Sequence, residues 1–502
     1  MRDEFELKLL LAPMQAERLM RSAAVRALSH GARPSAPAEL TTHYFDTPDH
    51  VLKARDIAVR VREDGERRVQ TVKLPGKRGN GLQHYKEIEA EIAGITPELD
   101  AIKGKKARVL RKGGVADSLA PVFTTKFTRK VLPLHFDGAE IELAADEGEI
   151  ASNGHRAPIS EMEIELKSGE PAQLFEVALK LHEAVPFRLG LATKAARGYA
   201  LAENATPKAQ RRRPVALDAD VTIGEAFAAM AHGFVEHVRI NEEAVLVARD
   251  PEAVHQIRVA IRRFRAALWV FRDVMDADSH VRTKDELRWM QRAFGPARDL
   301  DVLARQSVVP LIAHFPDDRG LLELRRATEQ AREAAYEEAI AALENPRWTR
   351  FLLQIEIWSV NGSWADDHRK ALRDPAIELA SKALAKRCKQ LRKRGGKTCE
   401  RTPEELHRVR VAAKKLRYLC EYFGPMFDED AAKAYSAQLA GVQEILGVLN
   451  DAAVARKLLD NVSAPERAKG IVLGWQEGRI VCELEKLGDA WKAFRKAEPF
   501  WT

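Results

Sequence analysis

The sequence of 502 residues predicts an α+β protein, with a β-rich part first and an all-helical part after it. Three observations lead to this prediction. Within the first 200 residues, apolar and charged side chains alternate over short runs, which is the period of β-strands. Beyond a Pro-punctuated segment the apolar period becomes helical. The helical part also contains an internal repeat, which predicts a duplicated structural unit.

Charge is nearly balanced along the chain, and this argues against a simple cationic tail. There are 81 basic and 74 acidic residues, which leaves a formal net charge of +7. Hydrophobic residues make up 45% of the chain, enough for buried cores. Function must therefore lie in local patterns of charge rather than in the total.

The first strand carries the clearest local pattern. In Glu4-Phe5-Glu6-Leu7-Lys8, strand geometry places Glu4, Glu6 and Lys8 on one face. Phe5 and Leu7 share the opposite face. Such a charged row can hold a divalent cation and a phosphate together, because hard cations take oxygen ligands and an ammonium group binds phosphate. The alternative is a solvated outer face opposite a core face.

Later strands in the first 200 residues are sorted by charge. A helical stretch from Met14 to Leu28 is followed by seven or eight short alternating segments, which predict an antiparallel sheet that could close into a barrel. Some segments present bases and others present acids, whereas an ordinary surface mixes both signs. The bases are Arg60, Arg62, Lys73 and Arg129, and the acids are Glu87, Glu89, Glu91, Glu140, Glu142, Glu161, Glu163 and Glu165. Segregated charges suit phosphoryl transfer, in which acids hold metal ions and bases hold phosphates.

Here the sequence resembles a known family. Glu4-X-Glu6-X-Lys8 near the N-terminus is the signature of the CYTH family, also called triphosphate tunnel metalloenzymes. Further matching pieces follow in order: Tyr44-Phe45-Asp46-Thr47, Arg60-X-Arg62, Lys73, Asp146-Glu147-Gly148-Glu149-Ile150, the run from Ile159 to Lys167, and the run from Lys194 to Tyr199. The resemblance covers residues 1–203.

The resemblance implies an eight-stranded antiparallel barrel whose interior is a charged tunnel and whose apolar faces are covered by helices. It implies that Mg²⁺ or Mn²⁺ is held by acids, for which the candidates are Glu4, Glu6, Asp146, Glu161, Glu163 and Glu165. It also implies that the triphosphate is bound by bases, for which the candidates are Lys8, Arg60, Arg62, Lys73 and Arg129. Glu4, Glu6 and Lys8 are the candidate catalytic residues. The family includes class IV adenylate cyclases and thiamine triphosphatases, and the tunnel motif alone does not choose among them.

Residues 204–217 are polar and Pro-punctuated, and we expect a linker there. Residues 218–502 then form a helical domain in which positions recur 152 residues later. His255 and Arg258, for example, recur as His407 and Arg410. The constant offset predicts two helical bundles related by a pseudo-twofold axis, at about residues 218–375 and 376–502.

Each repeat carries a row of bases on one helix. At 100° per residue, the four bases of each row fall within an arc of about 80°. We call these rows the basic rails: His255, Arg258, Arg262 and Arg265 in the first repeat, and His407, Arg410, Lys414 and Arg417 in the second. Acids such as Asp299 and Asp451 could pair with them. Otherwise the bases repel one another unless an anion lies between them.

These helices resemble the CHAD domain, the conserved histidine α-helical domain, through His255-X-X-Arg258-Val259 and His407-X-X-Arg410-Val411. The resemblance covers about residues 218–502 and implies that long-chain inorganic polyphosphate binds to the rails. Lys414 and Lys415 stand where the family has arginines, which keeps the charge but loses bidentate geometry.

A CYTH domain fused to a CHAD domain resembles the bacterial inorganic triphosphatases. This resemblance implies hydrolysis of tripolyphosphate to pyrophosphate and phosphate, with polyphosphate docked on the helical domain. Two alternatives stay open: a polyphosphate-binding adaptor with weak catalysis, and an enzyme for nucleotides or thiamine triphosphate, including a class IV adenylate cyclase. Nucleic acid is disfavoured as a partner, because the rails lack interleaved aromatic residues for base stacking.

The sequence also predicts where the protein works. It shows no basic-then-apolar leader and no apolar run long enough to cross a bilayer. Its four cysteines lack metal-type spacing, so we expect reduced thiols. We therefore expect a cytoplasmic protein without membrane partners, and association with polyphosphate granules is compatible with the CHAD resemblance.

Overall fold

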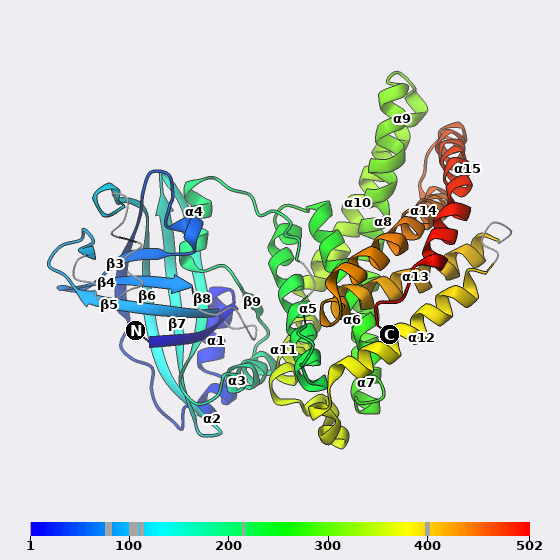
Figure 1. Cartoon of the computed structure of the whole chain (residues 1–502). Coiled ribbons are helices and arrows are strands. Elements are labelled where there is room, and N and C mark those ends of the chain that lie inside the picture. The colour runs from blue at the N-terminus through cyan, green and yellow to red at the C-terminus, as the bar shows by residue number, and fades with distance from the viewer. Residues whose placement is uncertain are drawn as a thin grey trace. The chain divides into compact units, whose positions relative to one another are not determined.

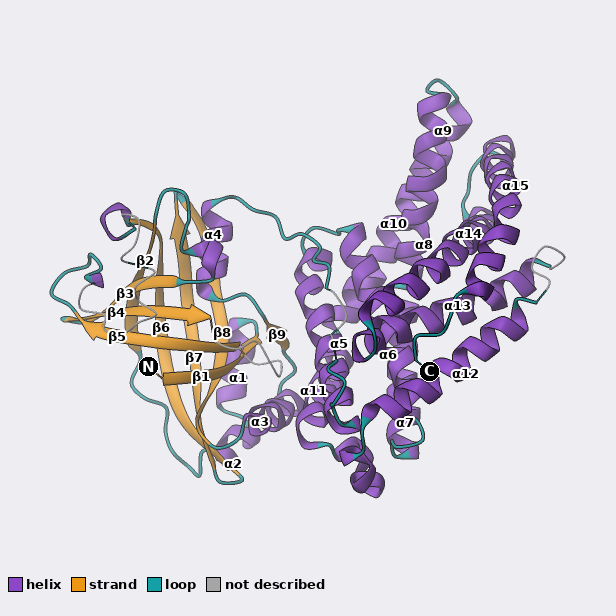
Figure 2. Ribbon diagram, in the orientation of Figure 1, coloured by secondary structure: helices purple, strands orange, loops and turns teal. Residues whose placement is uncertain are grey.

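The computed structural model describes residues 2–75, 83–99, 110, 115–212, 215, 217–396 and 402–501. The chain divides into two compact units (Figure 1). Unit 1 comprises Met1–Pro207 together with Glu344–Asn361, and unit 2 comprises Lys208–Leu343 together with Gly362–Thr502. Unit 1 is built on an antiparallel sheet and unit 2 is helical (Figure 2), so the predicted α+β class is confirmed.

The sheet of unit 1 has nine strands in the described part of the chain. They are β1 (Arg2–Leu10), β2 (Ala38–Asp46), β3 (Ala58–Asp64), β4 (Arg67–Pro75), β5 (Gln83–Glu91), β6 (Ala120–Phe136), β7 (Ala139–Ser152), β8 (His155–Ser168) and β9 (Arg188–Gly190). Their order is β5-β4-β3-β2-β6-β7-β8-β1-β9, and β1 pairs additionally with β5. Every one of these pairings is antiparallel.

The sheet has one strand more than the expected eight, so the eight-stranded barrel is not confirmed, and the edge of β1 explains the difference. β1 pairs with β8 on one side. On its other side it pairs with β5 through Arg2–Glu6 and with β9 through Lys8–Leu10. The short strand β9 thus uses the part of this edge that β5 leaves. Its three residues give no alternation by which a sequence pattern could detect a strand.

Two tight turns order the long central strands. Asp137-Gly138 joins β6 to β7, and Asn153-Gly154 joins β7 to β8. All four residues have positive φ, which favours Gly, Asn and Asp and matches the right-handed twist of a hairpin. These turns fix the register that brings Asp146 of β7 opposite Glu161 of β8.

Helices cover the apolar faces of the sheet. They are α1 (Pro13–Met20), α2 (Ala23–Leu28), α3 (Pro171–Ala184), α4 (Lys194–Ala202) and α11 (Pro346–Asn361). The single helix expected between Met14 and Leu28 is two helices, because Ser22 starts a new one. Its Oγ accepts a hydrogen bond of 3.2 Å from the N–H of Val25.

Helix α11 belongs to the core of unit 1 although it follows most of the first repeat in sequence. Leu353 is 0% exposed and Ile357 is 6% exposed. Both lie in one apolar cluster with Leu7 of β1 and Phe175 of α3. A segment from the middle of the chain therefore completes the packing of the first unit.

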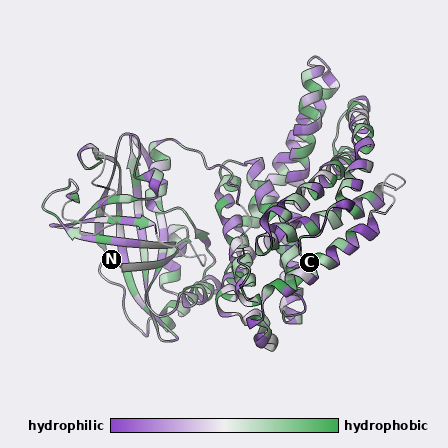
Figure 3. Cartoon of the chain, viewed as in Figure 1, coloured by the Kyte–Doolittle hydropathy of each residue, from purple (hydrophilic) through white to green (hydrophobic). Residues whose placement is uncertain are grey.

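Unit 2 consists of ten α-helices in the described residues. They are α5 (Ile223–Leu246), α6 (Pro251–Phe271), α7 (Ala277–Ala293), α8 (Gly295–Leu303), α9 (Val309–His314), α10 (Arg319–Glu344), α12 (Ala376–Arg394), α13 (Pro403–Phe423), α14 (Glu429–Asn461) and α15 (Glu466–Lys496). Hydrophilic residues prevail along α12 (Figure 3). Of the helices that the structure describes, none combines the length and the apolar character that a membrane span requires.

The repeat is visible in the helix bounds. Helices α6 and α13 begin 403 − 251 = 152 residues apart and end 423 − 271 = 152 residues apart. Helix α14 begins 429 − 277 = 152 residues after α7. The first repeat is interrupted near Pro296, which has no N–H to continue the helix, whereas Val448 at the corresponding position leaves α14 unbroken.

The starts of α5 and α12 are joined by a reciprocal pair of hydrogen bonds. The N–H of Ile223 donates to the carbonyl of Asp374, and the N–H of Ala376 donates to the carbonyl of Val221, both at 2.9 Å. Each partner is 153 residues from its counterpart, since 376 − 223 and 374 − 221 both equal 153. This reciprocity is the pattern that a local twofold relation between the repeats produces.

Candidate functional site

The charged face of β1 is buried. Glu6 is 5% exposed and Lys8 is 3% exposed. Because β1 pairs antiparallel with β8, Lys8 lies opposite Glu163 and its Nζ forms an ion pair with that carboxylate. The same Nζ lies 3.2 Å from Oε1 of Glu6 and 4.0 Å from Oε1 of Glu161. Of the row predicted from the first strand, Glu6 and Lys8 are therefore buried beside acids from β8 and do not face solvent.

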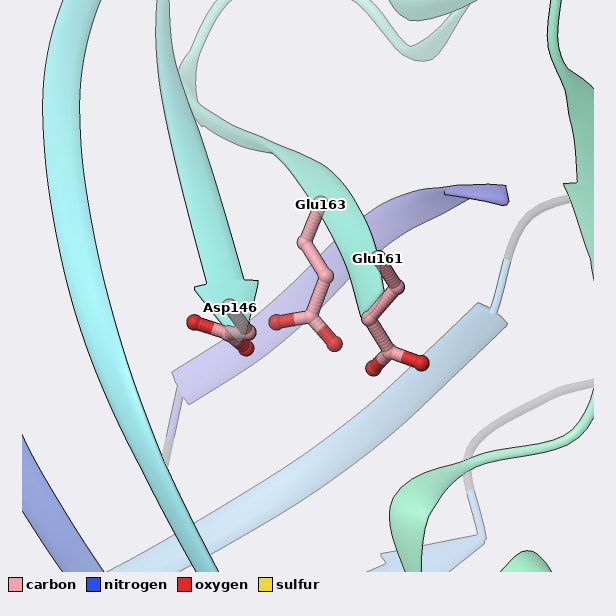
Figure 4. A group of neighbouring side chains, drawn as sticks. All are labelled: Asp146, Glu161 and Glu163. Atoms are coloured by element: carbon pink, nitrogen blue, oxygen red, sulfur yellow. The ribbon is translucent and has the colours of Figure 1, made fainter. Parts of the chain in front are cut away.

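Three carboxylates converge beside Lys8. They belong to Asp146 of β7 and to Glu161 and Glu163 of β8, and one oxygen of each lies within 4.8 Å of the others (Figure 4). All three side chains are buried. Alternation along β8 places Glu161 and Glu163 on the same face, and the register with β7 brings Asp146 to them. Oxygen donors so grouped are suited to a hard divalent cation.

Cationic side chains surround this carboxylate cluster. Nζ of Lys194 lies 2.7 Å from Asp146, 2.5 Å from Glu161 and 3.0 Å from Glu163. Arg129 donates two hydrogen bonds to Asp146, at 2.7 and 2.6 Å, and one to Glu163 at 2.7 Å. The acids and bases predicted on separate strands thus meet at one place.

The buried charges hold one another in the ionised form. Burial alone would raise the pKa of Glu163, but Lys194, Lys8 and Arg129 together hold it well below its usual value. Burial likewise opposes the charge of Lys8, yet Glu163, Glu6 and Glu161 raise its pKa well above the usual value. The site therefore presents full charges in a region of low dielectric, where they act more strongly than in water.

A second group of bases lies on β3 and β4. Lys73 lies 2.6 Å and Arg60 lies 3.5 Å from the carboxylate of Glu87 on β5. Repulsion by Arg60, followed by burial and by repulsion from Arg129, lowers the pKa of Arg62 to about 10. Nε of Arg62 is buried and has no hydrogen-bond partner among the described residues. Crowded bases of this kind favour an incoming anion.

Of the predicted metal ligands, Glu165 stands apart from the cluster, and for Glu4 only the backbone is described. Glu165 lies 2.7 Å from Lys167 and is not among the three grouped carboxylates. The backbone of Glu4 lies in β1 opposite Tyr85, but its side chain lies outside the described residues. The structure therefore brings together Glu6, Lys8, Arg129, Asp146, Glu161 and Glu163, with Arg60, Arg62 and Lys73 on the neighbouring strands β3 and β4.

Sequence reasoning missed two bases at this site. Lys194 contacts all three clustered carboxylates, and Arg197 donates a hydrogen bond of 2.9 Å to Glu161. Both lie in the first turn of α4, which Thr193 caps by accepting a hydrogen bond from the N–H of Ala196. Lys194 and Arg197 are three residues apart just after the cap, so they lie on one face of the helix. This spacing is the feature of the sequence that could have indicated them.

The basic rails lie on equivalent helices of unit 2. Arg258 of α6 lies 3.5 Å from Asp299, and Arg410 of α13 lies 3.9 Å from Asp451. These two pairs are 152 residues apart. The apolar stripe beside the first rail is buried, as expected: Val254, Ile257, Ile261, Phe264 and Leu268. Each rail thus runs along the edge of a buried helix.

The two rails influence each other. Burial, Arg410 and Arg262 lower the pKa of Lys414 to about 7, although Arg262 lies on the other rail. Lys414 forms no hydrogen bond or ion pair in the part of the chain that the structure describes. The histidines differ: burial and Arg298 lower the pKa of His255 to about 4, whereas His407 is exposed and lies 3.2 Å from Asn450.

Comparison with known families accounts for both units. Residues 2–199 match the CYTH domain, and residues 229–460 match the CHAD domain. The chain joins a CYTH domain to a CHAD domain. The resemblance predicted from the sequence is confirmed, and the carboxylate cluster and the rails lie in the CYTH domain and the CHAD domain respectively.

Individual relatives match parts of the chain. The inorganic triphosphatase of Haemophilus influenzae is 32% identical over 162 residues, which are 32% of this chain and 44% of that protein. An uncharacterized protein of Mycobacterium tuberculosis is 26% identical over 212 residues, 41% of this chain and 40% of that protein. The matched regions thus span less than half the length of these relatives. A crystal structure of the CHAD domain from Ricinus communis is 30% identical, with a TM-score of 0.51, and covers 58% of this chain and 98% of its own.

Proposed function

We propose that the CYTH domain hydrolyses inorganic tripolyphosphate to pyrophosphate and phosphate. The observation that carries this proposal is the buried meeting of Asp146, Glu161 and Glu163 with Lys8, Lys194 and Arg129. A triphosphate is a chain of anionic groups, and it needs closely spaced cations that are already ordered. The match to an inorganic triphosphatase supports this substrate class.

The proposal includes an architecture. The CYTH domain would comprise residues 1–203, with β1–β8 forming the tunnel, and the pairing of β1 with β5 supports closure of these eight strands. Residues 204–217 would link it to the CHAD domain at 218–502. Two bundles related by a pseudo-twofold axis would make up that domain, supported by the reciprocal bonds between α5 and α12.

Mg²⁺ or Mn²⁺ fits the donor set, because three buried carboxylate oxygens lie within 4.8 Å of one another. Asp146, Glu161 and Glu163 would hold the ion, with Glu4, Glu6 and Glu165 as further candidates. When bound, the metal supplies charge neutralisation and a more acidic water molecule. Lys8 and Lys194, which pair with the same carboxylates in this structure, would then be available to donate hydrogen bonds to phosphate oxygens.

The remaining residues would act on the phosphate chain. Arg60, Arg62, Lys73 and Arg129 would bind its oxygens and stabilise the charge that develops as the terminal phosphoryl group leaves. Glu4 and Glu6, on the same face of β1 as Lys8, would orient the attacking water. This assignment keeps every named group on the charged faces of strands.

The decisive experiment compares phosphate release from tripolyphosphate, ATP and thiamine triphosphate with Mg²⁺ present. We expect preference for tripolyphosphate, and we expect Arg129→Ala and Glu163→Gln to lower kcat by about 10²–10³-fold, because each removes preorganised charge. Arg156→Gln, also on β8 but exposed and paired with Glu149, is the matched control and should leave kcat unchanged. Much faster turnover of ATP, or formation of cyclic AMP, would contradict the substrate assignment.

We propose further that the CHAD domain binds long-chain inorganic polyphosphate along the basic rails: His255, Arg258, Arg262, Arg265, His407, Arg410, Lys414 and Arg417. Burial lowers the pKa of Lys414, and repulsion from Arg410 and Arg262 lowers it further; this crowding of bases supports an anionic ligand. The CHAD domain would thus hold the polymer on the same chain as the hydrolase domain. Association of the protein with polyphosphate granules would follow from such binding.

Replacing His255, Arg258, His407 and Arg410 together by Ala should weaken retention of long-chain polyphosphate by at least about 100-fold, since several phosphate contacts are lost. The matched control replaces Lys433, Arg456, Lys486 and Lys492, which are exposed cations on α14 and α15. Thermal unfolding checks that both variants are folded. Retention at the wild-type level by the rail variant would remove the rails from polyphosphate binding.

A further inference from the structure

A second group of bases in the CHAD domain surrounds Trp269 of α6 and consists of residues that are not part of the two rails. The guanidinium carbon of Arg387 on α12 lies 3.4 Å from the centroid of the Trp269 ring, and Nζ of Lys386 lies 5.6 Å from it. Arg394 of α12 and Lys415 of α13 belong to the same group, because burial lowers the pKa of Lys415 and repulsion by Arg387, by Arg394 and by Arg265 of the first rail lowers it further. We call these five residues the Trp269 cluster.

The bases of the cluster lack acidic partners. In the described part of the chain, Lys386, Arg387, Arg394 and Lys415 form no ion pair with a carboxylate. Arg387 is only 8% exposed; one amino group donates to Oε1 of Gln390 at 3.0 Å, and its buried Nε has no acceptor. A buried guanidinium without a counter-ion is costly in free energy. The rails differ, because Arg258 and Arg410 face Asp299 and Asp451.

The other half of the domain has a carboxylate at the position that corresponds to Trp269. There, Nε of Arg263 on α6 donates to Glu421 on α13 at 2.8 Å. Shifted by 152 positions between the repeats, this pair corresponds to Lys415 on α13 and Trp269 on α6, since 263 + 152 = 415 and 421 − 152 = 269. The carboxylate that neutralises the base in one half is therefore a tryptophan in the other.

Helix α12 adds to this imbalance. Between Lys382 and Arg394 it has seven basic residues and no acid. The corresponding stretch of α5, 153 residues earlier, contains one acid, Glu236, and one arginine, Arg239. The excess of positive charge therefore lies on α12 and has no counterpart on α5, and such a concentration of bases suits a polyanion.

The arrangement at Trp269 favours a phosphate chain over a nucleic acid. Its ring is already approached by Arg387 at 3.4 Å and by Arg272 at 4.4 Å, so a base would have to displace a guanidinium group in order to stack. A guanidinium group stacked on an aromatic ring keeps N–H groups in its own plane, and these suit phosphate oxygens. Arg387 is thereby held ready for such a contact.

We propose that the Trp269 cluster is a second inorganic polyphosphate site of the CHAD domain, made of residues outside the rails. This inference rests on the proposed function of that domain. A chain long enough to reach both places would be held by two sets of cations, so binding should favour long polymers over tripolyphosphate.

The test restores the acid in the full-length protein. Trp269→Glu would place a carboxylate opposite Lys415, as Glu421 lies opposite Arg263. We expect it to weaken binding of long-chain polyphosphate by about tenfold. The slope of log affinity against log salt concentration should fall by an amount that corresponds to about one to two phosphate contacts. Tripolyphosphate hydrolysis should not change.

A second variant avoids any change to the packing. Lys386→Gln with Arg394→Gln alters two exposed cations of the cluster, and Lys382→Gln with Lys389→Gln removes the same charge from other exposed positions of α12. The first pair should weaken binding clearly more than the second. Equal effects, or wild-type affinity in the first pair and in Trp269→Glu, would overturn the proposal.

Parallel measurements separate the possible failures. If the rail variant loses polyphosphate while the cluster variants retain it, the second site is wrong and the proposed function stands. If none of these variants changes binding, polyphosphate binding by the domain fails as a whole. Single-stranded RNA bound through the cluster as tightly as polyphosphate would also overturn the choice of ligand.

Discussion

Arg262 and Lys414 occupy equivalent positions in the two repeats, since 262 + 152 = 414, but they differ in chemistry. Arginine stays charged at any pH of interest. The lysine is crowded by Arg410 and Arg262, and burial together with this repulsion lowers its pKa to about 7. At this position the first rail therefore carries a permanent charge, whereas the second carries a base that titrates near neutrality.

This difference predicts a pH dependence of polyphosphate binding. A polyanion favours the protonated ammonium group, so affinity should fall as pH rises through about 7. Lys414→Arg keeps the charge and should flatten this dependence. Binding measured across the range from about pH 6 to pH 9 checks it, and Lys433→Arg, an exposed position on α14, is the control. A Lys414→Arg profile as steep as that of the wild type would contradict the prediction.

In the protein without a ligand, folding stability depends on pH in the opposite direction to binding. Because the pKa of Lys414 is lower in the folded protein than in the unfolded chain, its charged form opposes folding. This penalty is complete below about pH 7 and is relieved as pH rises towards the usual value of 10.5. The residue is therefore retained at a cost to stability, which is reasonable where a ligand compensates it.

Which residues meet in the carboxylate cluster could be predicted only where strands supply them. Alternation along β1 and β8 places Glu6, Lys8, Glu161 and Glu163 on charged faces, and the family resemblance then implied their roles. Lys194 was missed as a site residue because it comes from a helix, and a helix cap indicates where a helix starts but not which carboxylates it will meet. That information lies in the packing of α4 against the sheet, which no local pattern contains.

At the level of elements, α11 is the segment whose role was least predictable. Its apolar period indicates a buried face, yet a period does not say what will cover that face. The bounds of α6 and α13 could be predicted from caps and from the 152-residue offset. Helix α11 lies within residues 218–375, the predicted first repeat, and yet packs in unit 1.

This packing predicts a large effect from a small change in α11. Leu353→Ala removes a fully buried side chain and should lower the free energy of unfolding of unit 1 by about 2–5 kcal/mol. Arg350→Ala, on the same helix but exposed and 4.0 Å from Glu183, should change it by less than about 0.5 kcal/mol. Denaturant unfolding of the full chain measures both. Equal stability of the two variants would mean that α11 is not part of this core.

At the level of the whole molecule, the bases of the proposed sites differ in their partners. Arg129 is paired with Asp146 and Glu163. On the rails Arg258 faces Asp299, whereas Arg387 of the Trp269 cluster forms no ion pair with a carboxylate among the described residues. The net charge of +7 conceals this distribution, because paired and unpaired bases count equally in it.

The path of α11 also has a consequence for dissection of the protein. The chain passes from one unit to the other three times: after Pro207, after Leu343 and after Asn361. A single proteolytic nick in residues 204–217 would therefore give two fragments that still share a core, with α11 of the larger fragment buried in the smaller one. The halves should copurify as a complementing pair, and a clone that stops at the linker would express a domain with part of its interior missing.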